Sequence, residues 1–142
     1  MKIKVLIADD EKEFIEALAQ RLEVRDLAIT TVYSGEGAIE MAEKIDFDVI
    51  ILDVLMPEIS GLDALQQIKK SKPYTPIIML TGEATVTNAI QGMKQGAFDF
   101  LMKPADIEVL MKKITQANEL KHAHEDRIRQ AEIENILKTR GW

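Results

Sequence analysis

Residues 49–53 read Val49-Ile50-Ile51-Leu52-Asp53, four apolar residues followed by a carboxylate. A continuous apolar run of this kind is typical of a parallel strand that is buried on both faces. Similar short runs recur along the chain, and we predict that each forms a strand. The five predicted strands are Ile3–Ala8, Ala28–Tyr33, Val49–Val54, Ile77–Thr81 and Phe98–Met102. The second run is more polar than the others, which favours an edge strand.

Helical patterns fill the spaces between these runs. Apolar residues recur there at intervals of three and four, which indicates amphipathic helices. Asp10 with Glu13 three residues later is a capping-box pattern at the start of the first helix. Asp106 is expected to cap the fifth helix, and Gly96 to end the fourth. Strand and helix alternating five times predict an α/β fold, a doubly wound sheet of five parallel strands with right-handed crossovers.

Composition excludes several classes of protein. The chain has 142 residues, a formal net charge of −6 and no cysteine. This length fits one domain with a short appendage, and the lack of cysteine excludes disulfide frameworks, thiolate zinc sites and cysteine nucleophiles. The negative charge does not indicate direct nucleic-acid binding, and no apolar run approaches the roughly 18 residues of a membrane span. We therefore expect a cytoplasmic protein that binds neither nucleic acid nor membrane through this chain.

Residues 121–142 differ in character from the rest. Their formal charge is +1, against −7 for residues 1–120, and they contain no Gly or Pro before Gly141. We expect them to extend the fifth helix. Their apolar residues form a stripe too short and irregular for sustained heptads: Ile128, Ala131, Ile133, Ile136 and Leu137. A solvated helical tail is the first interpretation, and a helix that packs on a partner or on a second copy of the chain is the alternative.

Polar side chains stand where the predicted strands end. Because the carboxyl ends of parallel strands meet at one edge of the sheet, we expect Asp9, Asp10, Asp53, Thr81 and Lys103 to converge. Each has a simpler explanation on its own, such as a helix cap for Asp10 or a solvated loop position for Lys103. Together, the three carboxylates would repel one another, and a hard cation such as Mg²⁺ would relieve this repulsion.

A site of this composition suits phosphoryl transfer. Asp53 would act as the nucleophile and form an acyl phosphate. The metal, Lys103 and the Thr81 hydroxyl would each neutralise or bind one non-bridging oxygen of the phosphoryl group.

Four segments of the chain together resemble the receiver domain of two-component response regulators. The segments are Ala8-Asp9-Asp10-Glu11, Leu52-Asp53-Val54-Leu55-Met56-Pro57 with Gly61, Met79-Leu80-Thr81-Gly82, and Gly96-Ala97-Phe98-Asp99-Phe100-Leu101-Met102-Lys103-Pro104. They occur in the expected order and spacing over about residues 1–120, so residues 121–142 would form a charged helical tail or linker. The resemblance implies a flavodoxin-like fold with strand order 2-1-3-4-5 and an extended C-terminal helix.

The resemblance also implies a metal site and an acceptor. Asp53 is the implied phosphoacceptor for a histidine kinase. Asp9, Asp10, Asp53 and the backbone carbonyl of Leu55 are the implied Mg²⁺ ligands. The Leu55 side chain cannot orient water, whereas Glu83 can, so we hypothesise an acyl phosphate of moderately long lifetime, which timing the loss of phosphate would test.

A conformational switch is the third implied feature. Lys103 would contact the phosphoryl group, and the Lys103-Pro104 peptide would be cis. Thr81 would move toward the phosphoryl group, and Phe100 would turn inward with it.

The implied activity is signalling. Such a domain catalyses only its own phosphorylation and dephosphorylation, and controls a partner or an output domain. The chain could be a stand-alone regulator or the receiver of a larger transcriptional activator, because Val86–Pro104 looks similar to receivers joined to ATPase-type activators. A homodimer could form through the C-terminal helix or through the fourth helix and fifth strand. A remote alternative is an aspartate-nucleophile phosphatase of the haloacid-dehalogenase type, but that class needs a second Asp where this chain has Leu55 or Glu11.

Overall fold

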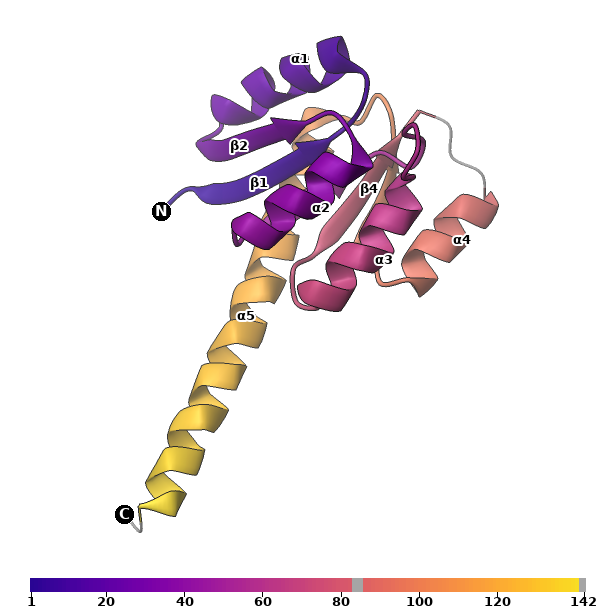
Figure 1. The fold of residues 1–142 in the computed structure, drawn as a ribbon. Helices are drawn as coiled ribbons and strands as arrows, with labels where there is room; N and C mark the ends of the chain where they lie inside the picture. The colour runs from indigo at the N-terminus through magenta and orange to yellow at the C-terminus, as the bar shows by residue number, and fades with distance from the viewer. Residues whose placement is uncertain (83–85, 141–142) are drawn as a thin grey trace.

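Strands and helices alternate along the chain in the computed structural model, which describes residues 1–82 and 86–140 (Figure 1). The strands of this part are β1 (Ile3–Ala8), β2 (Leu27–Val32), β3 (Val49–Leu52), β4 (Ile77–Thr81) and β5 (Asp99–Met102). Its helices are α1 (Lys12–Glu23), α2 (Gly35–Lys44), α3 (Gly61–Ser71), α4 (Val86–Lys94) and α5 (Ile107–Thr139). Each predicted strand is present, with small differences at the ends.

The strands form one parallel sheet in the order β2-β1-β3-β4-β5. This confirms the flavodoxin-like order and the position of β2 at an edge. Apolar side chains of α2 and α3 pack against one face of the sheet, and those of α1 and α5 pack against the other. The central strands β1, β3 and β4 are covered on both sides, which explains their continuous apolar sequences.

Backbone pairing extends past the strand ends and fixes the residues that follow. Ala8 of β1 is opposite Leu52 of β3, and the next amide, that of Asp53, donates to the Ala8 carbonyl at 3.0 Å. The Asp9 amide donates to the Val32 carbonyl at 3.2 Å. The sheet therefore holds the backbones of Asp9 and Asp53 side by side at its carboxyl edge.

The predicted helix caps are partly correct. The Asp106 carboxylate accepts from the amides of Glu108 and Val109, so Asp106 caps α5 as predicted. Gly96 has a φ of 101° after α4, the left-handed conformation expected at its C-terminal cap.

The capping box predicted at Asp10 is wrong. Helix α1 begins at Lys12, and its N-cap residue, Glu11, makes no side-chain capping hydrogen bond. The Asp9 carboxylate accepts from the Glu11 amide instead, at 2.9 Å, which leaves the Asp10 side chain at the carboxyl edge of the sheet.

Lys121 joins helix α5 to the segment that precedes β3. The Lys121 side chain is 4% exposed, and its ammonium donates to Asp46 Oδ1 at 2.9 Å and to the Phe47 carbonyl at 2.6 Å. The next residue, His122, lies with its Nε2 3.1 Å from Asp48 Oδ1. These contacts fix α5 against the segment that leads into β3.

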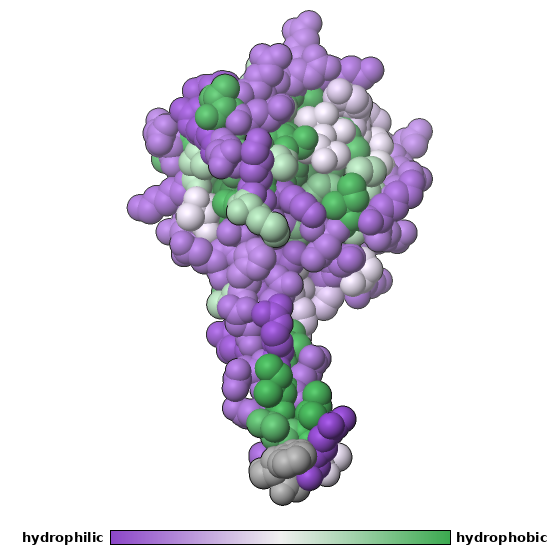
Figure 2. All heavy atoms as spheres, turned by 90° about the vertical axis from the view of Figure 1, so that its left-hand side faces the viewer, coloured by the Kyte–Doolittle hydropathy of each residue, from purple (hydrophilic) through white to green (hydrophobic). Residues whose placement is uncertain are grey.

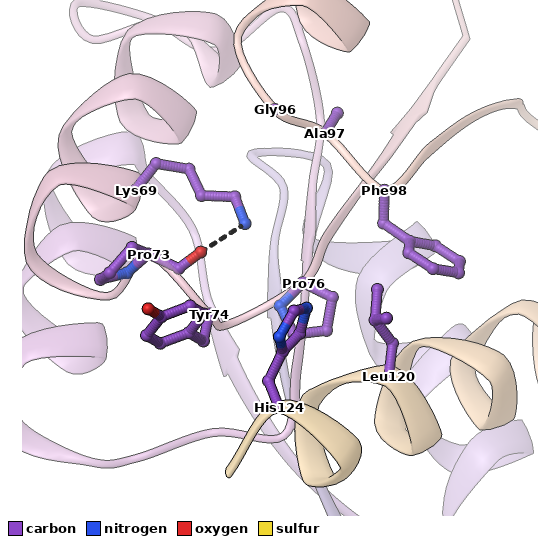
Figure 3. A pocket seen from close by; sticks show the side chains of 9 residues that line it. All are labelled: Lys69, Pro73, Tyr74, Pro76, Gly96, Ala97, Phe98, Leu120 and His124. Atoms are coloured by element: carbon purple, nitrogen blue, oxygen red, sulfur yellow. Dashed lines mark hydrogen bonds between the residues drawn. The ribbon is translucent and has the colours of Figure 1, made fainter. Parts of the chain in front are cut away.

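A cavity of about 300 Å³ lies where α5 leaves this amino edge of the sheet (Figure 3). The Tyr74 and His124 rings meet across it, with centroids 5.4 Å apart. The Lys69 ammonium donates to the carbonyls of Pro73 and Thr75 at 3.2 and 3.0 Å, and burial lowers the pKa of Lys69. None of the site residues predicted from the sequence lines this cavity.

Beyond these contacts, α5 projects away from the sheet (Figure 1). Its projecting part carries an exposed apolar patch, seen as green spheres near the end of the helix in Figure 2. The exposed large apolar residues of this part are Ile128, Ile133, Ile136 and Leu137. No helix within residues 1–82 and 86–140 combines the length and the apolar character that crossing a membrane requires.

The loop after β3 leaves no room for a side chain at the start of α3. A Cβ atom on Gly61 would lie 1.8 Å from the carbonyl oxygen of Asp53. The Gly61 amide donates to the Val54 carbonyl at 2.8 Å, which holds the two segments at this close approach.

Replacement of Gly61 therefore tests the packing of the loop that carries Asp53. We expect Gly61→Ala to lower the free energy of unfolding by about 1–3 kcal/mol, because the backbone of residues 53 and 54 must move. Gly92→Ala is the matched control: its Cβ would make ordinary contacts of 3.5 Å or more, and alanine in a helix is favoured by roughly 0.5–1 kcal/mol. Urea unfolding of both variants measures this difference, and a stable Gly61→Ala would contradict it.

Candidate functional site

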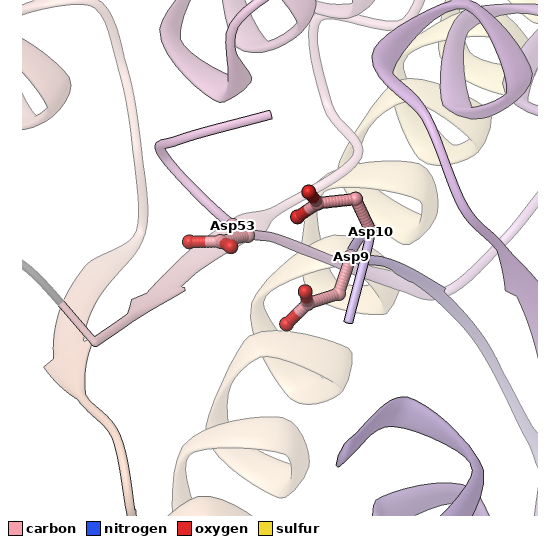
Figure 4. A group of neighbouring side chains, drawn as sticks. All are labelled: Asp9, Asp10 and Asp53. Carbon is pink, nitrogen blue, oxygen red and sulfur yellow. The ribbon is translucent and has the colours of Figure 1, made fainter. Parts of the chain in front are cut away.

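Three carboxylates meet at the carboxyl edge of the sheet (Figure 4). Asp9 and Asp10 follow β1, and Asp53 follows β3. Each offers an oxygen within 4.8 Å of the others, and the structure buries Asp9 and Asp53 but exposes Asp10. The described residues hold no second group of this kind.

Lys103 compensates part of this negative charge. It follows β5, and its amide donates to the Thr81 carbonyl at 2.7 Å, which brings it to the same edge. Its side chain is 8% exposed, and its ammonium lies 2.5 Å from Asp9 Oδ2 and 3.4 Å from Asp53 Oδ2. The peptide between Lys103 and Pro104 is cis, as the resemblance implied.

Two further residues contact Lys103 that the sequence did not identify. Glu11 Oε1 lies 3.1 Å from the ammonium, and the centre of the Phe14 ring lies 4.4 Å from it. The signal for Glu11 was its position as the third consecutive acidic residue after β1. Phe14 matched the apolar pattern of α1 and gave no sign of a second role.

Burial and charge act in opposite directions on this ion pair. Burial raises the pKa of Asp9 and the charge of Asp53 adds to this, although hydrogen bonds from Lys103 and from the Glu11 amide lower it. Burial disfavours the charged form of Lys103, but the neighbouring carboxylates outweigh burial and raise the pKa of its ammonium. Four carboxylates, those of Asp9, Asp10, Glu11 and Asp53, lie near this single ammonium, and an additional cation would reduce their repulsion.

One oxygen of the Asp53 carboxylate marks a position where a cation or a hydrogen-bond donor could bind. Asp53 Oδ1 is buried, and no donor from the described part of the chain reaches it. A cavity of about 230 Å³ opens beside it, lined by Asp10, Glu11, Asp53, Leu55, Thr81 and Gly82. Buried carboxylate oxygens are ordinarily hydrogen-bonded or bound to a cation, so this oxygen fits a ligand that enters through the cavity.

Thr81 and Phe100 lie on the same face of the sheet. Met79 is opposite Phe100, and Thr81 is opposite Met102, on the neighbouring strands β4 and β5. Residues two apart on a strand share a face, so Thr81 and Phe100 both face the side where α3 and α4 lie. Thr81 is buried, and Phe100 is partly buried against the apolar cluster of that side.

The structure thus brings together all five residues that we expected to converge: Asp9, Asp10, Asp53, Thr81 and Lys103. Leu55 lines the same cavity with a side chain that is 50% exposed. Glu83, the basis of the hypothesis on phosphate lifetime, lies outside the described residues.

Comparison with known proteins identifies the family. The sequence model of the response regulator receiver domain matches residues 5–115. The response regulator protein PilR of Pseudomonas aeruginosa is 34% identical over 134 residues, which is 94% of this chain and 29% of PilR. The uncharacterized transcriptional regulatory protein YkoG of Bacillus subtilis is 31% identical over 113 residues, 80% of this chain and 50% of YkoG. The chain spans half or less of the length of these relatives.

Solved structures agree with this comparison. A response regulator receiver domain from Clostridium thermocellum superposes with a TM-score of 0.81 at 34% identity, covering 84% of this chain and 97% of that one. A response regulator from Burkholderia pseudomallei, with a phosphorylated aspartic acid and a calcium ion, superposes with a TM-score of 0.76 at 27% identity. This match covers 99% of the present chain and 86% of the other. The chain belongs to the response regulator receiver family of two-component systems.

Proposed function

We propose that Asp53 accepts a phosphoryl group from the phosphohistidine of a partner histidine kinase in a reaction that requires Mg²⁺. The observation that carries this proposal is the buried Asp53 Oδ1, which accepts no hydrogen bond from the described residues, while Lys103 pairs with Oδ2 of the same carboxylate and Asp53 lines a cavity. A carboxylate that is held through one oxygen, and whose other oxygen accepts no hydrogen bond from the described residues, is arranged as a nucleophile. The phosphorylated aspartic acid of the Burkholderia relative supports this assignment by similarity.

The transfer requires little covalent chemistry from the protein. A carboxylate oxygen of Asp53 forms a bond to phosphorus while the P–N bond to the kinase histidine breaks. The electron pair of that bond stays on the imidazole, which takes up a proton from solvent. Lys103 and the Thr81 hydroxyl would bind phosphoryl oxygens, so the domain contributes positioning and charge stabilisation to its own phosphorylation.

Asp9, Asp10, Asp53 and the Leu55 carbonyl would hold the Mg²⁺ ion. The residues fit this ion because three carboxylates gather with a single lysine among them, and Mg²⁺ prefers oxygen ligands. Asp10 is exposed, which suits a site that keeps several waters on the metal. Bound Mg²⁺ would supply positive charge to the transferring phosphoryl group.

Phosphorylation would then act through Thr81 and Phe100. A phosphoryl group on Asp53 draws the Thr81 hydroxyl toward it, and the space left on that face of the sheet admits the Phe100 ring. Phe100 is partly buried, and its ring lies beside Gly92 of α4, 3.6 Å from where a Cβ on that glycine would be, so a movement of the ring would reach α4. The α4 and β5 surface would change with the ring.

We further propose that residues 1–120 form the receiver and that residues 121–142 connect it to an output domain in a transcriptional regulator of the cytoplasm. The greater length of PilR and YkoG supports this arrangement. A homodimer would form through α5, whose projecting part exposes apolar residues, or through the α4 and β5 face. A stand-alone regulator is the alternative form.

Phosphorylation is tested with acetyl phosphate and Mg²⁺. We expect wild-type protein to gain the mass of one phosphoryl group, and Asp53→Asn to gain none because the nucleophilic carboxylate is gone. Asp63→Asn, at an exposed position in the first turn of α3, is the matched control and should react like wild type. Chelation of Mg²⁺ should slow the reaction at least tenfold. Wild type that stays unmodified, in an assay that phosphorylates an established receiver, would contradict the proposal.

The raised pKa of Asp9 predicts how metal and pH affect stability. Because the folded-state pKa lies above the ordinary value of 3.8, the contribution of Asp9 to stability is full below pH 3.8 and is lost as pH rises through the folded-state pKa. At neutral pH without metal, Asp9→Asn should therefore unfold at a higher temperature than wild type, because the variant buries no charge at this position.

Adding Mg²⁺ should then stabilise wild type and leave Asp9→Asn nearly unchanged. Asp126→Asn, on the exposed part of α5, should behave like wild type in both conditions. Thermal unfolding at several pH values with and without Mg²⁺ measures this. Equal stabilisation of wild type and Asp9→Asn by Mg²⁺ would show that Asp9 is not part of the metal site.

The coupling between Thr81 and Phe100 is tested by measuring the binding of a phosphoryl analogue and the movement of the Phe100 ring separately. With beryllofluoride and Mg²⁺, the ring resonances of Phe100 should shift in wild type. In Thr81→Ala the ligand should still bind, but the equilibrium constant between switched and unswitched molecules should fall about fivefold because a hydrogen bond of about 1 kcal/mol is lost. Thr75→Ala, at a buried threonine on the opposite edge of the sheet, is the control. An unaltered Phe100 shift in Thr81→Ala would refute the coupling.

A further inference from the structure

Glu11 occupies a position from which its side chain can act on the site. It is the N-cap residue of α1 but makes no capping hydrogen bond with its side chain. Its backbone is held in place because its amide donates to Asp9 Oδ1 at 2.9 Å. The carboxylate therefore extends to the Lys103 ammonium at 3.1 Å and also lines the cavity beside Asp53.

The donors of Lys103 are fully used in the present arrangement. An ammonium has three N–H donors, and Lys103 has three carboxylate partners: Asp9, Glu11 and Asp53. The Phe14 ring contacts the same ammonium at 4.4 Å. A phosphoryl oxygen can receive a hydrogen bond from Lys103 only if one of these carboxylates gives up its own.

Exposure decides which carboxylate is released. Until the bond to phosphorus forms, Asp9 and Asp53 are both buried carboxylates, with side chains 3% and 5% exposed, so the loss of Lys103 costs more at either of them than at an exposed carboxylate. The Glu11 side chain is 64% exposed, so water can replace Lys103 at little cost in free energy. Glu11 is thus the exchangeable partner.

Resting on the proposed phosphorylation of Asp53, we propose that Glu11 is a positioning residue that holds the Lys103 ammonium in the unphosphorylated site and releases it to the phosphoryl group. Its negative charge also stands at the wall of the cavity through which an anionic phosphodonor must pass. Glu11 therefore slows phosphorylation through both effects and favours the unphosphorylated state. It does not touch the reacting atoms in this arrangement.

Three variants distinguish contact from charge. Glu11→Gln removes the charge and weakens the contact. Glu11→Asp keeps the charge but shortens the side chain by one methylene, so that the carboxylate no longer reaches Lys103. Glu13→Gln removes a charge from the first turn of the same helix and serves as the matched control for the general field of the protein.

The rate constant for phosphorylation by acetyl phosphate is the first readout. We expect Glu11→Gln and Glu11→Asp to react about two- to fivefold faster than wild type, the range of an ion pair with one exposed partner. Glu13→Gln should stay near the wild-type rate. Glu11→Asp at the wild-type rate beside a faster Glu11→Gln, or Glu13→Gln as fast as Glu11→Gln, would overturn the positioning role.

The second readout needs no phosphorylation. The ¹⁵N resonance of the Lys103 ammonium, assigned by its loss in Lys103→Arg, should shift in both Glu11 variants of the unphosphorylated protein and stay in place in Glu13→Gln. An unshifted resonance in the Glu11 variants would overturn the inference even if Asp53 is phosphorylated. Wild type that accepts no phosphoryl group while the resonance shifts as expected would instead contradict the proposed function.

Discussion

The ion pairs of the Lys103 ammonium with Asp9 and Asp53 join the ends of β5, β1 and β3 at one edge of the sheet. Without this ammonium, two buried carboxylates would face each other with no positive charge between them, and such an arrangement is strongly destabilising. The rest of the site depends on this constraint. It explains the raised pKa of Lys103 and the inward position of a lysine that would ordinarily be solvated. It also offsets part of the rise that burial causes in the pKa of Asp9.

The same constraint makes the site responsive to charge. The protein provides one ammonium for three carboxylates in direct contact, and Asp10 adds a fourth acidic group nearby. A divalent cation would lower the repulsion among these carboxylates. A phosphoryl group would change which oxygens accept hydrogen bonds from the Lys103 ammonium. An arrangement that is electrostatically incomplete by itself responds to such ligands more strongly than a neutral pocket does.

The fold could be predicted from sequence because its signals are local. A continuous apolar run such as Val49–Leu52 indicates by its composition alone that the strand is buried. Asp106 could be predicted as a cap because it is close in sequence to the amides that it caps. The convergence of Asp9, Asp53 and Lys103 followed from the geometry of parallel sheets alone.

The contacts that could not be predicted join residues that are far apart in sequence. Glu11 reaches Lys103 across 92 residues, and Lys121 reaches Asp46 across 75. Nothing near Lys121 in the sequence marks it as buried, since it lies in a charged segment. The prediction that Asp10 caps α1 was wrong although its local sequence pattern fits a cap. The Asp9 carboxylate accepts a hydrogen bond from the Glu11 amide, and α1 begins at Lys12.

The attachment of α5 at Lys121 makes the rest of that helix a lever. From Lys121 to Thr139 the helix rises about 27 Å at 1.5 Å per residue, and its pivot contacts the segment that leads into β3, the strand that ends at Asp53. Over that length, a rotation of about 5° at the pivot would move the far end by roughly 2 Å. A rotation of α5 that is too small to break contacts in the sheet would thus shift the exposed apolar residues near the end of the helix relative to any surface that packs against them.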